Sequence, residues 1–210
     1  WVKAVRKICD ENGILLVADE VQTGFCRTGR MFATNYWEES GVQPDILATA
    51  KSIAAGVPLS AIVAREEIME ASAPGTIGGT FCGNALACAA ALKTIEIMER
   101  DDIAGRSCEI GEKVSKRFNE WKEKYPVIGD VRGLGGMIGL EFVKDQKTKE
   151  PYPEFSAAVI KGCVQKGLMI EGAGTYGNVI RFLAPLVMTD EQLEAGLDIY
   201  ESVIKELLEK

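Results

Sequence analysis

Three short apolar runs in the first third of the chain limit what it can fold into. They are Ile14–Ala18, Asp45–Thr49 and Leu59–Ala64. Such runs are β-prone and too short for typical helices, and they indicate strands buried inside a parallel or mixed sheet. Helical or loop segments separate them, so the pattern predicts an α/β domain. Three strands are few for a sheet of this kind, and we expect neighbouring strands from residues upstream of this sequence.

After residue 100 the pattern changes, which places a domain boundary there. A helix is predicted over Glu109–Tyr125, with one apolar face made of Ile110, Val114, Phe118, Trp121 and Tyr125. A glycine-rich, β-prone stretch at 131–143, a helix at 155–166 and short strands at 168–170 and 179–182 follow. The capping box Thr189–Gln192 then opens a last helix. The second part therefore reads as a small α+β domain.

Charge and hydropathy exclude two classes of partner. The chain has 24 Lys and Arg against 31 Asp and Glu, a net charge of −7, and no basic block. A nucleic-acid-binding protein carries a basic stripe, so we predict no nucleic-acid partner. The longest near-apolar run, Ala85–Leu92, is far shorter than the ~20 residues that cross a bilayer, so we predict no membrane partner.

The absence of histidine restricts the chemistry further. With 0 His in the chain, Ser-His-Asp and Cys-His catalysis and histidine metal sites are excluded. The 6 cysteines form no CxxC pair and no zinc spacing, so we predict no metal site. Scattered thiols indicate a reducing compartment, and we expect a cytoplasmic protein. Acid–base chemistry falls to Lys, Asp, Glu, Tyr or Cys.

Asp19 and Lys51 stand at the ends of the first two apolar runs. Open α/β sheets bind ligands at the carboxyl ends of their strands, so these side chains are expected at one sheet edge. Lys51 is flanked by Ala50 and Ser52. A partly desolvated lysine there would be a nucleophile toward carbonyl groups. The plainer alternatives are that Asp19 caps the next turn and that Lys51 is an ordinary surface lysine.

Two glycine-rich segments invite opposite interpretations. The loop Gly78–Asn84 leads into a predicted helix, and its backbone N–H groups with the Thr80 hydroxyl could hold a phosphate. Alternatively it is a connector with Asn84 as N-cap. The segment Gly172–Gly177 matches GxGxxG, but the β-like sequence Asn178–Leu183 follows it. A dinucleotide site requires a helix at that point, so we reject this reading.

Arg181 lies within the strand-like segment Val179–Leu183, between apolar neighbours. An arginine that points from such a strand into a cleft suits bidentate binding of a carboxylate. The alternative is an edge-strand arginine held in a structural ion pair.

Together these motifs resemble the pyridoxal-phosphate (PLP)-dependent class III aminotransferases of fold type I, and most of all their 4-aminobutyrate aminotransferase members. The resemblance covers essentially all 210 residues in one collinear order. It is carried by Asp19–Gly24, Arg27–Gly29, Pro44–Lys51, Gly79-Thr80, Gly129–Gly135 and Asn178–Pro185.

The resemblance implies roles for five residues toward the cofactor PLP. Lys51 would form the internal Schiff base, and Asp19 would pair with the pyridine nitrogen and keep it protonated. Val21 would pack on the ring face and Gln22 would hydrogen-bond the phenolic oxygen. Thr80 would reach the cofactor phosphate across the interface of a homodimer.

For the substrate, the resemblance implies that Arg181 holds a carboxylate. The implied reaction is transamination of an omega-amino acid such as 4-aminobutyrate, with the 2-oxo acid 2-oxoglutarate as acceptor. Residues 1–100 would be the C-terminal part of the PLP-binding large domain, with a mixed, mostly parallel sheet, and residues 101–210 the small C-terminal domain.

Three alternatives stay open. Amino-acid epimerases of the same family share the lysine and the aspartate, and so do ornithine-, acetylornithine- and lysine-type transaminases. Outside the family, the chain could be a non-enzymatic nucleotide-binding or interaction module, which would leave the position of Lys51 unexplained.

Two departures from the family pattern are visible. Phe25-Cys26 precedes Arg27 where the family often has small residues, so we expect a different local turn. The upstream half of the family, with a phosphate loop and an aromatic residue stacked on the cofactor ring, has no counterpart in this sequence. We therefore expect these 210 residues by themselves to be inactive.

Overall fold

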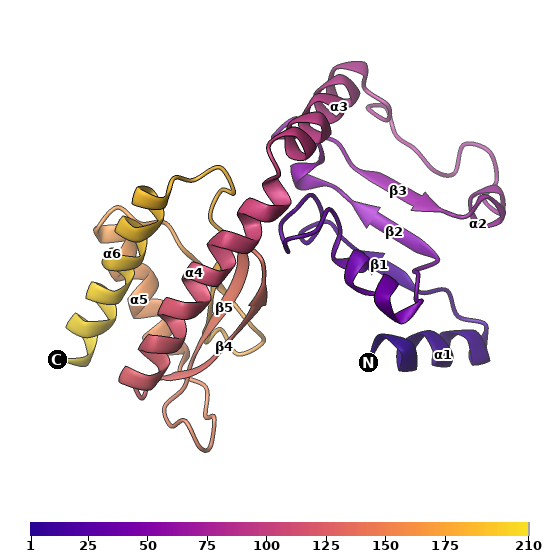
Figure 1. Cartoon of the computed structure of the whole chain (residues 1–210). Coiled ribbons are helices and arrows are strands. Elements are labelled where there is room, and N and C mark those ends of the chain that lie inside the picture. The colour runs from indigo at the N-terminus through magenta and orange to yellow at the C-terminus, as the bar shows by residue number, and fades with distance from the viewer. Residues whose placement is uncertain (210) are drawn as a thin grey trace. The chain divides into compact units, whose positions relative to one another are not determined.

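The computed structural model describes residues 1–209 and divides into two compact units, Trp1–Gly105 and the part from Arg106 onward. Figure 1 shows that each unit has its own sheet and helices. No helix among residues 1–209 is both long and apolar enough to cross a membrane.

The first unit is a small mixed α/β structure. A three-stranded sheet has the order β1-β2-β3, with β1 parallel to β2 and β2 antiparallel to β3. Its helices and strands are α1 (Val2–Asn12), β1 (Val17–Asp19), β2 (Ile46–Thr49), β3 (Ala61–Ala64), α2 (Glu66–Glu70) and α3 (Ala85–Arg100). Three 3-10 helices complete it, at Ala33–Tyr36, Glu38–Ser40 and Lys51–Ala54. The predicted α/β class is confirmed.

The first apolar run differs from its prediction. The strand covers only Val17–Asp19, and Ile14, Leu15 and Val17 are 54%, 49% and 54% exposed instead of fully buried. The reason is the sheet order, because β1 is an edge strand with β2 as its neighbour in this sheet. The helix α1 ends at Gly13, which adopts the left-handed φ of 63°.

A buried carboxylate fixes β1 against β2. Asp45, just before β2, accepts hydrogen bonds from the Leu16 N–H and from Arg6 Nη1, both at 2.7 Å. Arg65 Nη2 lies 3.1 Å from its other oxygen. The Leu16 N–H and then Arg6 hold the pKa of Asp45 below its usual value. These contacts set the register in which Val17, Ala18 and Asp19 pair with Ile46, Leu47 and Ala48.

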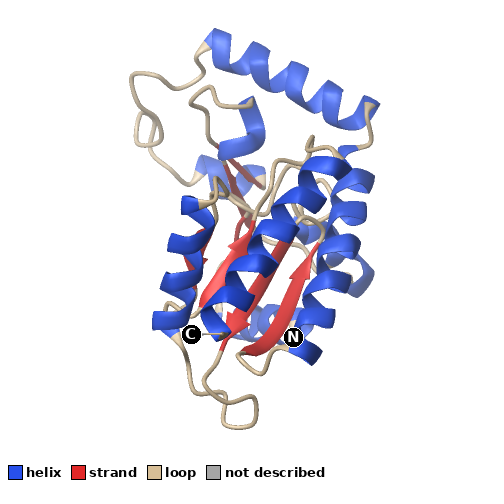
Figure 2. Cartoon of the chain, turned by 90° about the vertical axis from the view of Figure 1, so that its left-hand side faces the viewer, coloured by secondary structure: helices blue, strands red, loops and turns tan. Residues whose placement is uncertain are grey.

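The second unit packs three helices with a four-stranded antiparallel sheet of order β4-β5-β7-β6. Figure 2 shows its helices lying across its strands. The elements are α4 (Ile103–Lys124, which begins just before the unit boundary), β4 (Ile128–Leu134), β5 (Met137–Phe142), α5 (Pro153–Gln165), β6 (Glu171–Ala173), β7 (Val179–Phe182) and α6 (Asp190–Leu208). The strand predicted at 168–170 is wrong by three positions, because β6 begins at Glu171.

The core of the second unit is aromatic and closed. The ring of Phe118 on α4 lies 5.0 Å from Trp121, 5.7 Å from Tyr200 and 6.3 Å from Phe182 between ring centroids. The predicted apolar face of α4 is confirmed, since Ile110, Val114, Phe118, Trp121 and Tyr125 are all buried. The capping box of Thr189 and Gln192 at the start of α6 is also confirmed.

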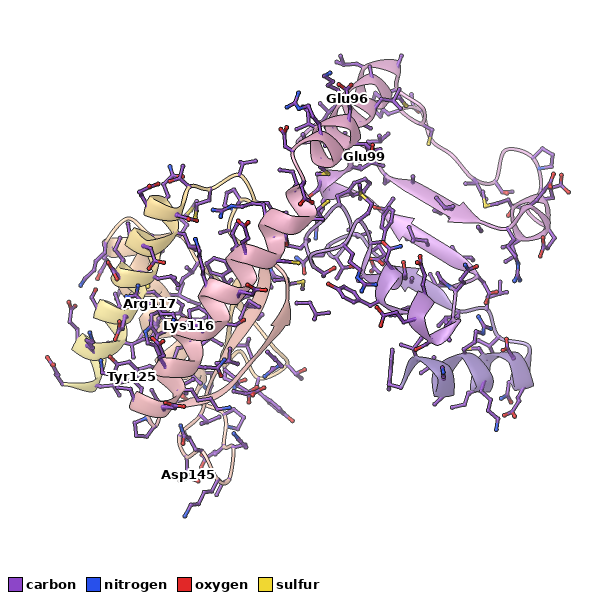
Figure 3. All side chains as sticks on the ribbon, viewed as in Figure 1. Glu96, Glu99, Lys116, Arg117, Tyr125 and Asp145 are labelled. Atoms are coloured by element: carbon purple, nitrogen blue, oxygen red, sulfur yellow. The ribbon has the colours of Figure 1, made fainter. Side chains whose placement is uncertain are left out.

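Charged side chains join α4 to α6 along the outside of this core. Glu201 on α6 accepts a hydrogen bond from the Tyr125 hydroxyl at 2.8 Å and lies 3.2 to 3.3 Å from nitrogens of Lys124, Lys205 and Arg117. Arg117 and Tyr125, labelled in Figure 3, lie beside α6. Burial alone would raise the pKa of Glu201, but these four donors lower it to about 2.

Candidate active site

Two polar side chains lie at one edge of the first sheet, where β1 and β2 end. Asp19 is the last residue of β1 and pairs in register with Ala48 of β2. Lys51 comes directly after the end of β2 and begins the 3-10 helix Lys51–Ala54. Because β1 and β2 are parallel, the carboxylate and the amine both follow the carboxyl ends of neighbouring strands. Such an edge is where sheets of this class bind ligands.

Asp19 is exposed and held in a fixed orientation. Its Oδ1 accepts the N–H of Val21 at 3.0 Å, and the Glu20 N–H continues the strand pairing to the Ala48 carbonyl at 2.8 Å. The turn-capping alternative is therefore correct for one oxygen. Within residues 1–209 no hydrogen bond to the second oxygen of Asp19 is found. This oxygen can therefore accept a hydrogen bond from an N–H or O–H group of a ligand.

Glu20 is a site residue that the sequence reading missed. It is 2% exposed, and its carboxylate accepts hydrogen bonds from the Thr23 hydroxyl and from the N–H groups of Ala33 (3.1 Å) and Thr34 (2.6 Å). These bonds fold the segment 21–34 back over the end of β1. The sequence signal for this role was the position of Glu20, the second of two acids directly after an apolar run. A carboxylate buried there requires several hydrogen-bond donors.

The turn after Glu20 is unusually tight. A Cβ at Gly24 would lie 2.8 Å from the Glu20 carbonyl oxygen, so only glycine fits there. Phe25 and Cys26 follow with φ of 57° and 69°, the left-handed region that side chains rarely adopt. Both are nevertheless buried, and this burial anchors the turn.

Lys51 combines exposure with backbone strain. Its φ is 52°, in the left-handed region, which costs an L-residue on the order of 1 kcal/mol. Ile53 and Ala54, in the same 3-10 helix as Lys51, are buried in a cluster with Phe25 and with Ala91 of α3. Their burial holds the strained turn in place. Strain maintained by its surroundings is characteristic of functional positions.

The expectation that Lys51 is partly desolvated is wrong for this chain, because the side chain is exposed. The physical reason is that the sheet edge beyond β2 is open in the first unit. The amine is thus accessible, but within this chain its surroundings do not remove it from solvent.

The other predicted cofactor-binding residues differ in their burial and location. Val21 and Gln22 are half-buried in the turn directly after Asp19. Thr80 lies on the exposed loop before α3, and no hydrogen bond joins it to Asp19 or Lys51 within residues 1–209. The connector alternative is correct for the end of this loop, since Asn84 caps α3 by accepting the N–H groups of Leu86 and Ala87, both at 3.1 Å.

Arg181 belongs to the second unit and lies on β7, between β5 and β6. Its Nη2 is 2.7 Å from Oε2 of Glu171, the residue opposite it on β6. The ion pair of the alternative reading is therefore present, but its edge-strand placement is wrong because β6 forms the edge. The strand predicted after Gly172–Gly177 is confirmed, since this segment leads into β7 and not into a helix.

Comparison with known proteins assigns the family. The family model described as aminotransferase class III matches residues 1–204. The chain therefore belongs to the class III aminotransferases.

Individual members of the family show how similar the chain is to proteins with a named activity. The chain is 46% identical over 98% of its length to a 5-aminovalerate aminotransferase of Pseudomonas putida KT2440, and 41% identical over 98% to a 4-aminobutyrate aminotransferase of Escherichia coli K12. A crystal structure of a Bacillus anthracis aminotransferase superposes on 97% of the chain with a TM-score of 0.88 and 35% identity. The chain spans about half of each, namely 48%, 48% and 47% of their lengths.

Proposed function

We propose that this chain is the part of a PLP-dependent aminotransferase that carries the reactive lysine, and that the whole enzyme transfers the amino group of an omega-amino acid to 2-oxoglutarate. The observation that carries the proposal is the placement of Asp19 and Lys51 at the ends of two neighbouring parallel strands. The similarity to aminotransferases named for 4-aminobutyrate and 5-aminovalerate supports an omega-amino donor.

The residues of this edge fit PLP by their chemistry. PLP needs an amine for its aldehyde and an acid near its ring nitrogen, and it then supplies an electron sink for the substrate carbon. Lys51 offers an exposed amine, and Asp19 offers a carboxylate oriented by the Val21 N–H. Two such groups on one edge, with no histidine in the chain, suit a reaction in which lysine itself handles the proton.

Each residue then has a separate task. Lys51 would hold the cofactor through Nζ and, when free of it, would move a proton at the substrate carbon. The Asp19 carboxylate would keep the ring nitrogen protonated. Val21 covers one ring face, and Gln22 orients the phenolic oxygen. Glu20 acts through the turn, since its three hydrogen bonds fix the segment that carries Val21 and Gln22.

Reductive labelling tests the lysine assignment in the full-length protein that contains this chain. After incubation with PLP, borohydride fixes the cofactor to the lysine that holds it, and peptide mass spectrometry locates the label. We expect the label on Lys51, complete loss in Lys51→Ala, and no change in Lys3→Ala, an exposed lysine of α1. Label on another residue, or none in the wild type, would support the non-enzymatic module instead.

A donor screen tests the substrate class. We expect 4-aminobutyrate or 5-aminovalerate to react faster than ornithine and branched-chain amino acids, with 2-oxoglutarate as acceptor. Racemised product in the absence of any oxo acid would identify an epimerase, and preference for ornithine would identify an ornithine-type transaminase.

The chain of 210 residues is proposed to be inactive alone, because the Asp19 and Lys51 edge is open and both side chains are exposed. The absorption spectrum of this chain with added PLP tests that. We expect weak cofactor binding and no turnover; strong absorption with turnover would contradict it.

Further assignments complete the proposal. Residues 1–100 belong to the cofactor domain and 101–210 to a small C-terminal domain, in a cytoplasmic homodimer whose six cysteines are free thiols. Thr80 would bind the cofactor phosphate of the partner subunit, which agrees with its exposed position. We expect Thr80→Ala to weaken PLP binding and Thr80→Ser to preserve it. A monomeric enzyme with full activity would contradict this assignment.

A further inference from the structure

Two segments of the first unit have left-handed backbone, one after β1 and the other after β2. Phe25 and Cys26 have φ of 57° and 69°, and Lys51 has φ of 52°. A residue with a side chain stays in this region only where its surroundings hold it there. The first segment belongs to the turn that follows Asp19, and the second begins the 3-10 helix Lys51–Ala54. The candidate site therefore has a strained turn on each side.

A single apolar cluster contains residues of both turns. Its buried members are Phe25, Ile53, Ala54 and Ala91. Phe25 is the only one of these four that comes from the segment after β1, and its side chain, 4% exposed, is the largest of them. The ring of Phe25 is thus the main buried contact between the turn after Asp19 and the helix that Lys51 begins.

The Phe25 ring is also tied to the polar part of its own segment. Its centroid lies 5.4 Å from that of Phe32, in an edge-to-face arrangement. Phe32 directly precedes Ala33 and Thr34. The N–H groups of these two residues donate to the buried carboxylate of Glu20. Phe25 therefore packs both against the segment fixed by Glu20 and within the cluster shared with the lysine turn.

We propose that Phe25 is a positioning residue that makes the two left-handed turns depend on each other. While its ring is packed, both turns are held; when one turn relaxes, the shared contact is lost and the other turn loses its support. The inference rests on the proposed function, since the task it assigns to Phe25 is to keep the Lys51 amine in a fixed geometry relative to Asp19, Val21 and Gln22.

Coupling of this kind is reciprocal, which separates it from simple space filling. A truncation on either side of the cluster should loosen both turns, and coupling of ordinary size changes the opening equilibrium of the distant segment by about 5- to 150-fold. If Phe25 only filled space in its own turn, its truncation would loosen residues 20–34 and leave residues 51–57 unchanged.

Amide hydrogen exchange measures the coupling in the full-length protein that contains this chain, without PLP. Both 20–34 and 51–57 contain backbone hydrogen bonds whose opening the exchange reports. We expect Phe25→Ala and Ile53→Ala each to accelerate exchange in both segments by about five-fold or more. Phe155→Ala is the matched control, because it truncates a buried ring of the second unit and should leave both segments unchanged.

Smaller truncations keep the test decisive if an alanine variant does not fold. Phe25→Leu and Ile53→Val remove fewer atoms from the cluster, and each should still accelerate exchange in both segments, by less than the alanine variants. Acceleration confined to the segment that carries the substitution would overturn the coupling.

Kinetics of the PLP-loaded enzyme test the positioning role. We expect Phe25→Ala to lower kcat by about 10- to 100-fold and to change KM for the amino donor by less than about two-fold, because misplacement acts on the reacting geometry more than on binding. Phe25→Leu, which refills the cluster, should restore most of kcat. An unchanged kcat in Phe25→Ala, with both turns loosened, would overturn the positioning role.

Borohydride labelling distinguishes a failure of this inference from a failure of the proposed function. Label on Lys51, together with exchange that changes only in residues 20–34 of Phe25→Ala, would overturn the coupling and leave the proposed function in place. Exchange that changes in both segments, with label on a residue other than Lys51, would support the coupling and overturn the proposed function.

Discussion

The two units of this chain differ in the kinds of side chain that they bury completely. In the second unit the largest fully buried side chains are apolar: Phe118, Phe142, Ile110, Ile128, Ile138, Leu140, Ile180, Leu193, Leu197, Ile204 and Val114. In the first unit the corresponding residue is a carboxylate, Glu20. The second unit is organised around a large hydrophobic core. The first combines a smaller apolar cluster of Phe25, Ile53, Ala54 and Ala91 with hydrogen bonds that place polar groups at a sheet edge.

The exposed residues show the same contrast. The first unit exposes twelve large apolar side chains: Trp1, Ile8, Ile14, Leu15, Val17, Ile62, Val63, Ile77, Phe81, Leu86, Leu92 and Ile97. In the second unit, residues 106–209 expose six, namely Leu134, Val164, Met169, Tyr176, Val187 and Leu208. Contiguous exposed apolar surface marks a contact surface. The comparison teaches that the first unit leaves more apolar surface uncovered than the second, which closes its own core.

Expressing the two units separately tests this contrast most strongly. We expect residues 101–210 to unfold in one cooperative transition, because their core is closed. Residues 1–100 should bind a hydrophobic dye and unfold without a sharp transition. Urea denaturation followed by circular dichroism and dye fluorescence measures both. A cooperative transition in residues 1–100 would break the comparison.

Matched truncations of apolar side chains come next in size. Phe118→Ala should destabilise the second unit by about 3–5 kcal/mol, because the ring is fully buried among three other aromatic rings. Val63→Ala, in the first unit, removes a side chain that is 60% exposed and should cost less than about 0.5 kcal/mol. Equal losses in chemical denaturation would show that Val63 is covered.

The acid sensitivity of the second unit is a smaller effect. The pKa of Glu201 falls from 4.5 to about 2 on folding, so its contribution is complete above pH 4.5 and is lost as the pH falls toward 2. Glu201→Gln should cost about 1–3 kcal/mol at pH 7 and flatten the acid limb of the stability curve. Glu206→Gln, on the same helix, is the control. An unchanged acid limb in Glu201→Gln would contradict the network.

The smallest effect concerns backbone strain in the first unit. Lys51→Gly should stabilise the chain by about 1 kcal/mol over Lys51→Ala, because glycine adopts a φ of 52° without strain. Thermal unfolding of the two variants measures the difference. If Lys51→Gly is no more stable than Lys51→Ala, the left-handed backbone at this position carries no cost.

Local sequence predicted most of the elements, because their signals are local. The apolar face of α4 and the capping box of α6 each lie within a few residues of the structure they specify. The edge shared by Asp19 and Lys51 also followed from the order of apolar runs. Burial did not follow, since the exposure of Ile14, Val17 and Lys51 depends on what packs against the sheet.

Polar contacts between residues far apart in the sequence were the other feature that the sequence did not predict. The donors to Glu20 lie 13 and 14 residues away, and Arg6 reaches Asp45 over 39 residues. Glu171 and Arg181 are ten apart and meet only through the β6–β7 register. No propensity or period encodes such partners, so they become visible only with the fold.

The strained backbone at Lys51 also has a meaning for laboratory evolution. A library selected for heat resistance alone would favour glycine at position 51, and each generation would gain stability while losing the only amine that follows β2. Selection for stability and selection for activity would then favour different residues at position 51. A scan for non-glycine residues that gain stability as glycine would also mark Phe25, Cys26, Ala55, Asp102 and Lys149, whose φ is positive too, so position 51 is distinguished from them by the amine it places at the end of β2.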